Sequence, residues 1–243
     1  MSRRIQRRQF VKASAALAAG SVLPSSVQAF DANAQLRTAH VGVGGMGGAD
    51  LKSVSSHSAV EVAALCDVDA NILKEASAKF PNARTFRDYR EMISEMGDAI
   101  DACVVSTPDH THAPAAMTAM NHGKPVYCQK PLTHEVFEAR QLRLVAEKKG
   151  LVTQMGIQAS AGLPYRRATQ MIQSGVIGKV SRVLAWSYKN WGYDGPAFTK
   201  FDDVPENLDW NLWLGTAAMR SFKKGVYHRG AWRKQIDFGT GTL

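Results

Sequence analysis

Between residues 36 and 156, short apolar runs alternate with longer segments of mixed polarity. The runs have the length of buried strands, and the segments between them carry the apolar spacing of helices. This alternation predicts a parallel, doubly wound sheet of the α/β class, whose ligand crevice lies beyond the carboxyl ends of the strands. The predicted strands are 38–43, 60–66, 102–106, 125–128 and 151–155, and the predicted helices lie near 45–56, 69–80, 88–96, 113–122 and 134–149.

Local signals mark some ends of these helices. Asp69 and Thr133 are suited to cap helix N-termini, and His122-Gly123 is typical of a helix stop. After residue 156 the pattern changes. A longer, partly alternating strand is predicted from Lys179 to Lys189, followed by a segment rich in Trp and Pro. We therefore place a domain boundary near 157, with a first domain at 35–156 and the start of an α+β domain at 157–243.

A glycine motif follows the first predicted strand. Gly42-x-Gly44-x-x-Gly47 lies between that strand and a helix that begins near Gly45 and Met46, and Asp67 follows the last glycine by twenty residues at the end of the second strand. The glycines permit a tight turn, close approach of the backbone to a pyrophosphate, and close packing of helix on strand. The phosphates would lie on free N–H groups of the helix. The alternative is an ordinary glycine-rich turn, but the flanking strands and Asp67 favour a dinucleotide site. Because Asp67 would bond the ribose hydroxyls and repel a 2'-phosphate, we expect NAD rather than NADP.

The first 34 residues read as a leader rather than as part of the fold. Basic residues precede an apolar run, 13–23, that is too short to span a bilayer, so no stable membrane span is predicted. Residues 6–12, with Arg7-Arg8, resemble the twin-arginine signal, and 27–29 and 32–34 are possible cleavage sites. This predicts recognition by the twin-arginine machinery and export of a folded protein, for example to the periplasm. The alternative is a basic disordered tail.

The leader also changes how the net charge is interpreted. The chain carries +9, but its first 29 residues hold five basic and no acidic residues, so the remainder would have 25 basic against 21 acidic residues. No basic stripe interleaved with aromatics follows, which excludes nucleic acid as a leading partner. The three cysteines form no CxxC pair, so neither a disulfide framework nor a zinc ribbon is predicted.

Polar residues gather after two predicted strands. Residues 106–112, Ser-Thr-Pro-Asp-His-Thr-His, follow one strand as a polar turn, and Gln129-Lys130-Pro131 follow the next. A lysine at this edge can exchange a proton with a substrate oxygen, and partial burial would lower its pKa toward that task. The alternative for a single lysine is a solvated surface charge. His110, His112 and Cys128 lack a further ligand at suitable spacing, so no metal site is predicted.

Several segments together resemble the Gfo/Idh/MocA oxidoreductases, which include glucose–fructose oxidoreductase and inositol dehydrogenase. The matching segments are 42–47, 66–69, 106–113, 125–132, 175–180 and 237–241. The resemblance implies a Rossmann domain and a second domain built on a large open, mainly antiparallel sheet that makes a homo-oligomer interface. It also implies hydride transfer between a nicotinamide cofactor and a sugar, polyol or glycoside carbon.

The resemblance also assigns roles to single residues. Lys130 matches the lysine of the family's Glu-Lys-Pro motif, which assists proton transfer. Thr107, Pro108, Asp109 and His110 match the loop beside the cofactor, and Gln158 matches a polar residue near the nicotinamide. Gln129 replaces the usual glutamate, and losing that negative charge should lower the proton affinity of Lys130. The chain ends at Leu243, before the family's Asp-x-x-x-His segment, so we expect it to be truncated and its second domain to be incomplete.

Three functional classes remain open. The leading one is a dehydrogenase, favoured by Lys130-Pro131. A glycosidase that uses bound NAD is the second, and a non-catalytic dinucleotide-binding protein is the third. The aromatic residues beyond 160 suit either a sugar site or packing, and His228 and Arg233 lie near the last matching segment; the aromatics are Tyr165, Trp191, Tyr193, Trp210 and Trp213.

Overall fold

A computed structural model describes residues 35–189, 192–193 and 195–241. The predicted leader, with its Arg7-Arg8 pair, and Trp191 lie outside the described residues. Within these residues no helix has the length and apolar character needed to cross a bilayer.

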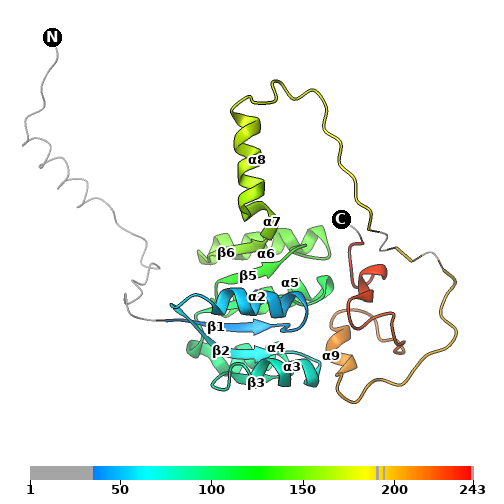
Figure 1. Ribbon diagram of the computed structural model, residues 1–243. Coiled ribbons are helices and arrows are strands. Elements are labelled where there is room, and N and C mark those ends of the chain that lie inside the picture. The colour runs from blue at the N-terminus through cyan, green and yellow to red at the C-terminus, as the bar shows by residue number, and fades with distance from the viewer. Residues whose placement is uncertain (1–34, 190–191, 194, 242–243) are drawn as a thin grey trace, which may run out of the picture. The chain divides into compact units, whose positions relative to one another are not determined.

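The centre of the fold is a six-stranded parallel sheet with the strand order β3-β2-β1-β4-β5-β6 (Figure 1). Its strands are β1 (Leu36–Val41), β2 (Val60–Cys66), β3 (Arg84–Phe86), β4 (Ala102–Val105), β5 (Val126–Gln129) and β6 (Thr153–Gly156). The order reverses between β1 and β4, where two crossovers leave in opposite directions. Loops at such a switch point diverge and leave a crevice for a ligand.

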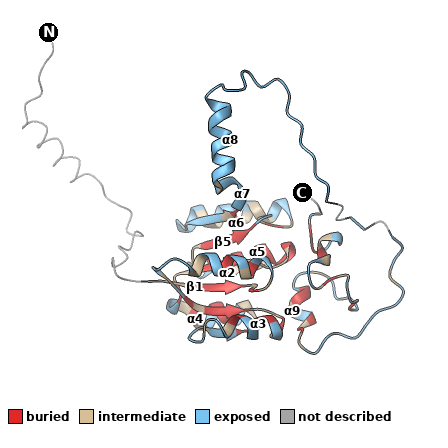
Figure 2. Cartoon of the chain, viewed as in Figure 1, coloured by how far each residue is buried: buried red, intermediate tan, exposed pale blue. Residues whose placement is uncertain are grey.

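Helices cover both faces of this sheet. On one face α2 (Met46–Ser55) and α3 (Ala70–Ser77) pack on a core that includes Val62 and Leu65. On the other, α4 (Tyr89–Met96), α5 (Asp109–Asn121) and α6 (Val136–Lys149) pack on a larger core that includes Val105 and Met120. A 3₁₀ turn, Gly97–Ala99, follows α4. With both faces covered, the inner strands β4 and β5 and the carboxyl-terminal halves of β1 and β2 are largely buried, whereas the edge strands β3 and β6 are mostly exposed (Figure 2).

The predicted doubly wound sheet is confirmed, with each predicted strand and helix of 35–156 present within a few residues of its expected bounds. Asp69 caps α3 by accepting hydrogen bonds from the N–H groups of Asn71 and Ile72. Helix α5 ends at Asn121 with His122 as its C-cap, followed by Gly123 at φ 75°. The short strand β3 was not predicted, because three residues carry too little pattern.

Two local predictions were wrong. Residues 109–112 are not a turn, because α5 begins at Asp109 rather than near 113. The polar sequence gives no helical pattern for this first turn, in which Asp109 and His110 are buried in contact with the C-terminal segment. Thr133 does not cap α6 either. Glu135 does so in a capping box with Glu138, while the Thr133 hydroxyl donates to the carbonyl of Glu135.

After β6 the chain forms α7 (Gln158–Ala161) and α8 (Leu163–Gln173). The strand predicted at 179–189 is absent from the described structure, in which 174–206 contain neither helix nor strand. Its apolar side chains are exposed, for example Val183 at 80% and Tyr188 at 92%. A strand needs a neighbour for its N–H and C=O groups, and no described segment pairs with this one.

The segment 207–241 returns to the carboxyl edge of the sheet. Its α9 (Trp210–Leu214) and a 3₁₀ turn at Ala231–Lys234 belong to an aromatic cluster, defined as Leu208, Trp210, Trp213, Leu214, Phe222, Tyr227, Trp232 and Phe238. Backbone hydrogen bonds tie it to the loop after β2 and to the start of α5: the N–H of Asp209 donates to the carbonyl of Val68, and that of His110 to Phe238. The segment therefore closes over the strand ends rather than forming a separate body.

Helix α2 crosses β1 in very close contact at Gly47. A Cβ added at Gly47 would lie 1.9 Å from the carbonyl oxygen of Gly42, whereas one added at the neighbouring Gly48 would lie 3.1 Å from the carbonyl oxygen of Val43. The first approach is impossible for a side chain without backbone movement, and the second is only tight.

We expect Gly47→Ala to reduce the free energy of unfolding by more than about 2 kcal/mol, because the new methyl group forces α2 away from β1. Gly48→Ala should stay within about 1 kcal/mol of the wild type, since the gain in helix propensity offsets the tight contact. Urea titration of both variants by circular dichroism measures the difference. Equal stability of the two would contradict the assigned contact.

Candidate functional site

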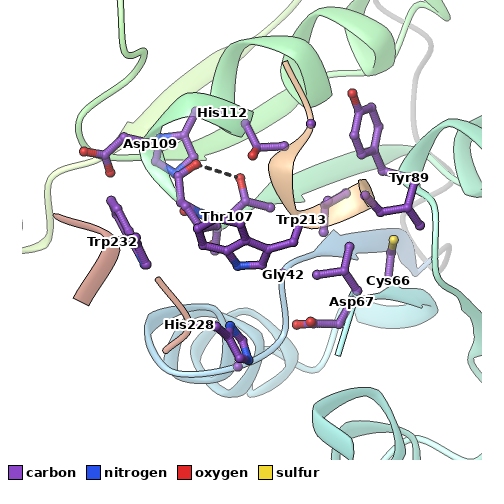
Figure 3. A pocket seen from close by; sticks show the side chains of 18 of the residues that line it. Gly42, Cys66, Asp67, Tyr89, Thr107, Asp109, His112, Trp213, His228 and Trp232 are labelled. Carbon is purple, nitrogen blue, oxygen red and sulfur yellow. Dashed lines mark hydrogen bonds between the residues drawn. The ribbon is translucent and has the colours of Figure 1, made fainter. Parts of the chain in front are cut away.

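A cavity of about 460 Å³ lies at the carboxyl ends of the strands. Its walls come from the loops after β1, β2, β3, β4 and β5 and from the C-terminal segment 207–241. Figure 3 shows Gly42, Asp67 and Thr107 from the sheet side of this cavity, together with Trp213, His228 and Trp232 from the C-terminal segment. The cavity therefore occupies the switch point of the sheet.

The glycine loop after β1 forms one wall. Gly42 has φ 79°, and a Cβ there would lie 2.7 Å from the carbonyl oxygen of Ser106. A Cβ at Gly44 would meet Ile72 Cδ1 at 2.8 Å. Gly44, Gly45 and Met46 line the cavity where α2 begins, and the first amides of a helix have no partner within it. The loop thus offers backbone donors and the positive end of a helix dipole to an anion.

Asp67 lies at the end of β2 and also lines the cavity. Its carboxylate accepts hydrogen bonds from the N–H groups of Val43 and Asp69, each at 3.0 Å. Burial raises the pKa of Asp67, and these two hydrogen bonds oppose that rise. The carboxylate is therefore held in one orientation beside the glycine loop.

The turn after β5 carries Lys130, which is exposed at the edge of the cavity rather than partly buried as expected. His112 supports the turn from α5, with Nδ1 2.6 Å from the carbonyl oxygen of Pro131 and Nε2 2.8 Å from that of Thr107. Burial lowers the pKa of His112. A neutral ring carries one N–H, so His112 donates to only one of these two carbonyls, and the tautomer decides which.

The C-terminal segment is anchored to the sheet side of the cavity by Asp69. One carboxylate oxygen of Asp69 lies 2.8 Å from His228 Nε2, and the other accepts from Asn207 Nδ2 at 2.7 Å. Burial alone would raise the pKa of Asp69, but the hydrogen bonds from Asn207, His228 and the α3 backbone lower it overall. This anchor holds His228 in the cavity wall.

The structure brings most of the predicted site residues into this one cavity. Those that line it are Gly42, Gly44, Gly45, Met46, Asp67, Thr107, Pro108, Asp109, Gln129 and Lys130, and His228 and Arg233 do so as well. Gly47 serves the packing of α2 instead. His110 is buried in contact with the aromatic cluster, where Nε2 lies 3.1 Å from the carbonyl oxygen of Trp213. Gln158 is exposed on α7, 3.8 Å from the sulfur of Met46, and does not line the cavity.

The aromatic residues divide between packing and the site. Trp210 stacks on Trp213 with ring centroids 4.9 Å apart, which supports the packing alternative. Trp213 nevertheless also lines the cavity, whereas Tyr165 and Tyr193 are exposed and do not.

Sequence reasoning missed several residues of the site. Arg87, Tyr89 and Trp232 line the cavity, and Asp50 lies buried behind it. Asp50 could have been found from the sequence, because it is a carboxylate three residues after Gly47 on the helix of the glycine motif. The other three had no such signal, because only the folded loops bring them to this edge.

Comparison with known proteins gives the family. The model of the Gfo/Idh/MocA family, described as an oxidoreductase family with an NAD-binding Rossmann fold, matches residues 36–157. An inositol 2-dehydrogenase of Salmonella typhimurium is 28% identical over 147 residues, covering 59% of this chain and 43% of the relative. A glycosyl hydrolase family 109 protein of Stenotrophomonas maltophilia is 31% identical over 204 residues, covering 74% of this chain and 42% of the relative.

Solved structures agree with the observed fold. The crystal structure of myo-inositol 2-dehydrogenase from Lactobacillus plantarum superposes with a TM-score of 0.56 at 29% identity, covering 60% of this chain and 43% of that one. The chain thus spans less than half the length of the curated relatives it matches. On the match to residues 36–157, the chain belongs to the Gfo/Idh/MocA oxidoreductase family and has its NAD-binding Rossmann fold.

Proposed function

We propose that this chain belongs to an NAD-dependent oxidoreductase that transfers hydride between the nicotinamide and a sugar, polyol or glycoside carbon. The observation that carries the proposal is one cavity that joins the glycine loop, Asp67 and Lys130. The first two suit a dinucleotide, and the third places an acid–base group at the same opening. The likeness to an inositol 2-dehydrogenase supports the substrate class.

The wall of the cavity suits the cofactor in shape and charge. Gly42, Gly44 and Gly47 leave no room for side chains where the loop turns, so the pyrophosphate would approach backbone N–H groups at the start of α2. Asp67 would accept hydrogen bonds from the adenosine ribose. A 2'-phosphate would need a cation, and the two arginines that line the cavity after β3 are already engaged: Arg87 with the carbonyls of Val68 and Asn207, and Arg90 with the carboxylate of Asp88 at 2.5–3.0 Å. These features support NAD over NADP.

The bound nicotinamide would supply the hydride chemistry, and the chain's part is to orient the substrate and move its proton. Lys130 would hold the substrate oxygen and exchange that proton, while Thr107, Pro108 and the ring of His112 keep the neighbouring loops in place. The exposure of Lys130 at the cavity edge leaves its ammonium group accessible to a substrate.

A second candidate is a glycosidase that uses bound NAD. It is favoured by the glycosyl hydrolase family 109 relative, whose match covers 74% of this chain. Both functions would use the same cofactor site. A panel of polyols and glycosides, followed for NADH formation and for hydrolysis in parallel, distinguishes them.

For the cofactor, we expect NAD to bind more tightly than NADP, because the Asp67 carboxylate would repel a 2'-phosphate. Asp67→Ala should narrow the difference, whereas Asp98→Ala, an exposed carboxylate outside the cavity, should leave it unchanged. Isothermal calorimetry with both nucleotides measures the ratio. A preference of about tenfold or more for NADP in the wild type would refute the assignment.

For catalysis, Lys130→Met in a full-length version of the protein should leave the NAD dissociation constant nearly unchanged and lower kcat by about two to four orders of magnitude, the range of a general acid or base. Lys148→Met, on the exposed side of α6, is the matched control and should keep full activity. The substrate is the best member of the polyol and glycoside panel. Undiminished kcat in the Lys130 variant would remove the lysine from the mechanism.

We further propose export through the twin-arginine pathway, followed by homo-oligomerisation. Changing Arg7 and Arg8 together to Lys keeps the charge but should retain the protein in the cytoplasm, because the receptor reads the guanidinium pair. Immunoblots of periplasmic and cytoplasmic fractions give the result. Normal accumulation of the double variant in the periplasm would show that the pair is not a signal.

A further inference from the structure

A buried carboxylate joins α2 to the ends of two strands behind the cavity. Asp50, 6% exposed, accepts a hydrogen bond from Ser106 Oγ at 2.7 Å. Both of its oxygens also lie near Gln129 Nε2, at 2.8 and 3.1 Å. Ser106 follows β4 and Gln129 ends β5, so one side chain on α2 links the two loops that carry Thr107 and Lys130.

The carboxylate determines which way the Gln129 amide faces. Gln129 is 3% exposed, and an ionised carboxylate can only accept, so the NH₂ group must point to Asp50. The amide oxygen then faces the opposite way and accepts from the backbone N–H of Lys130 at 3.1 Å. If the amide were reversed, two oxygens would face each other and the Lys130 N–H would lose its acceptor.

A glycine at the end of β6 makes room for this amide. A Cβ on Gly156, at the end of β6, would lie 3.0 Å from Gln129 Nε2 and 2.6 Å from the Tyr127 hydroxyl, so the absence of a side chain there makes room for both. Burial, with smaller effects of Asp50 and Cys128, raises the pKa of Tyr127, and burial raises the pKa of Cys128 to about 12. Both groups therefore stay neutral between pH 5 and 9 and add no charge beside Asp50 and Gln129.

We propose that Asp50 is a positioning residue for Lys130, which acts through the Gln129 amide and requires one carboxylate and one amide facing each other. The inference rests on the proposed function for its effect on turnover, but its structural part stands on the contacts alone. This pairing explains why glutamine stands at position 129 instead of the glutamate usual in the motif: the Asp50 carboxylate needs a hydrogen-bond donor opposite it.

Exchanging the two groups tests the pair. Gln129→Glu places two carboxylates about 3 Å apart, so one must take up a proton and its pKa rises. Because the folded pKa then exceeds the unfolded one, the variant is most stable below the unfolded glutamate pKa of about 4.3 and should lose stability as the pH rises from there through the raised pKa. Asp50→Asn combined with Gln129→Glu restores one donor and one carboxylate in reversed order, and it should recover stability at pH 8.

Two measurements on the full chain compare these variants with the wild type. The first is Tm from pH 5 to 9 without cofactor, where only Gln129→Glu should show a steep fall. The second is the nuclear magnetic resonance signal of Lys130 in protein whose lysines are reductively methylated with ¹³C, assigned by its loss in Lys130→Met. This signal should shift in Gln129→Glu and in Asp50→Asn, and return toward its wild-type position in the double variant.

An unshifted Lys130 signal in both single variants would overturn the positioning role, even if Tm changed. Failure of the double variant to recover Tm would overturn the pairing itself. Turnover is read separately: kcat/KM of Gln129→Glu should fall about tenfold or more from pH 6 to 9 relative to the wild type, with recovery in the double variant. If wild-type protein turns over no panel substrate, the proposed function fails, while the Tm and resonance results still decide the inference.

Discussion

The close crossing of α2 over β1 is the contact on which the rest of the site depends. It is possible only because Gly47 has no Cβ to meet the Gly42 carbonyl. This contact fixes where α2 begins, and therefore where its unpaired amides point. It also places Asp50, one turn further along α2, within hydrogen-bonding distance of Ser106 and Gln129. The distance between helix and strand thus governs both the anion-binding end of the cavity and the support of Lys130.

Buried carboxylates hold the carboxyl edge together, and each is compensated by donors from separate parts of the chain. Asp50 joins α2 to β4 and β5, Asp69 joins α3 to Asn207 and His228, and Asp109 accepts from the backbone and hydroxyl of Thr240. Burying a charge is costly unless it is paired or hydrogen-bonded. Losing one donor at these positions should therefore destabilise the contact between the elements that the carboxylate connects. Specific geometry at the cavity is therefore maintained by polar contacts rather than by apolar packing alone.

The C-terminal segment contributes a different kind of stability. Its aromatic cluster packs against His110 and Val68, and Trp213 takes part in both the cluster and the cavity wall. Aromatic side chains bury a large area and prefer tilted or offset contacts, which suits a short segment with little regular structure. The result is a wall for the cavity that lies more than fifty residues after the last strand of the sheet.

The sequence by itself determined the doubly wound sheet, the glycine loop, Asp67 and the position of Lys130 at a strand end, because these depend on local periodicity and on spacing within one crossover. It did not reveal that α5 begins at Asp109, that His110 is buried rather than part of the cavity, or that 179–189 form no strand. Nor did it reveal the partnership of Asp50 with Gln129, which are 79 residues apart. Such features depend on which distant segments cover or pair with a residue, and only the tertiary structure brings those segments together.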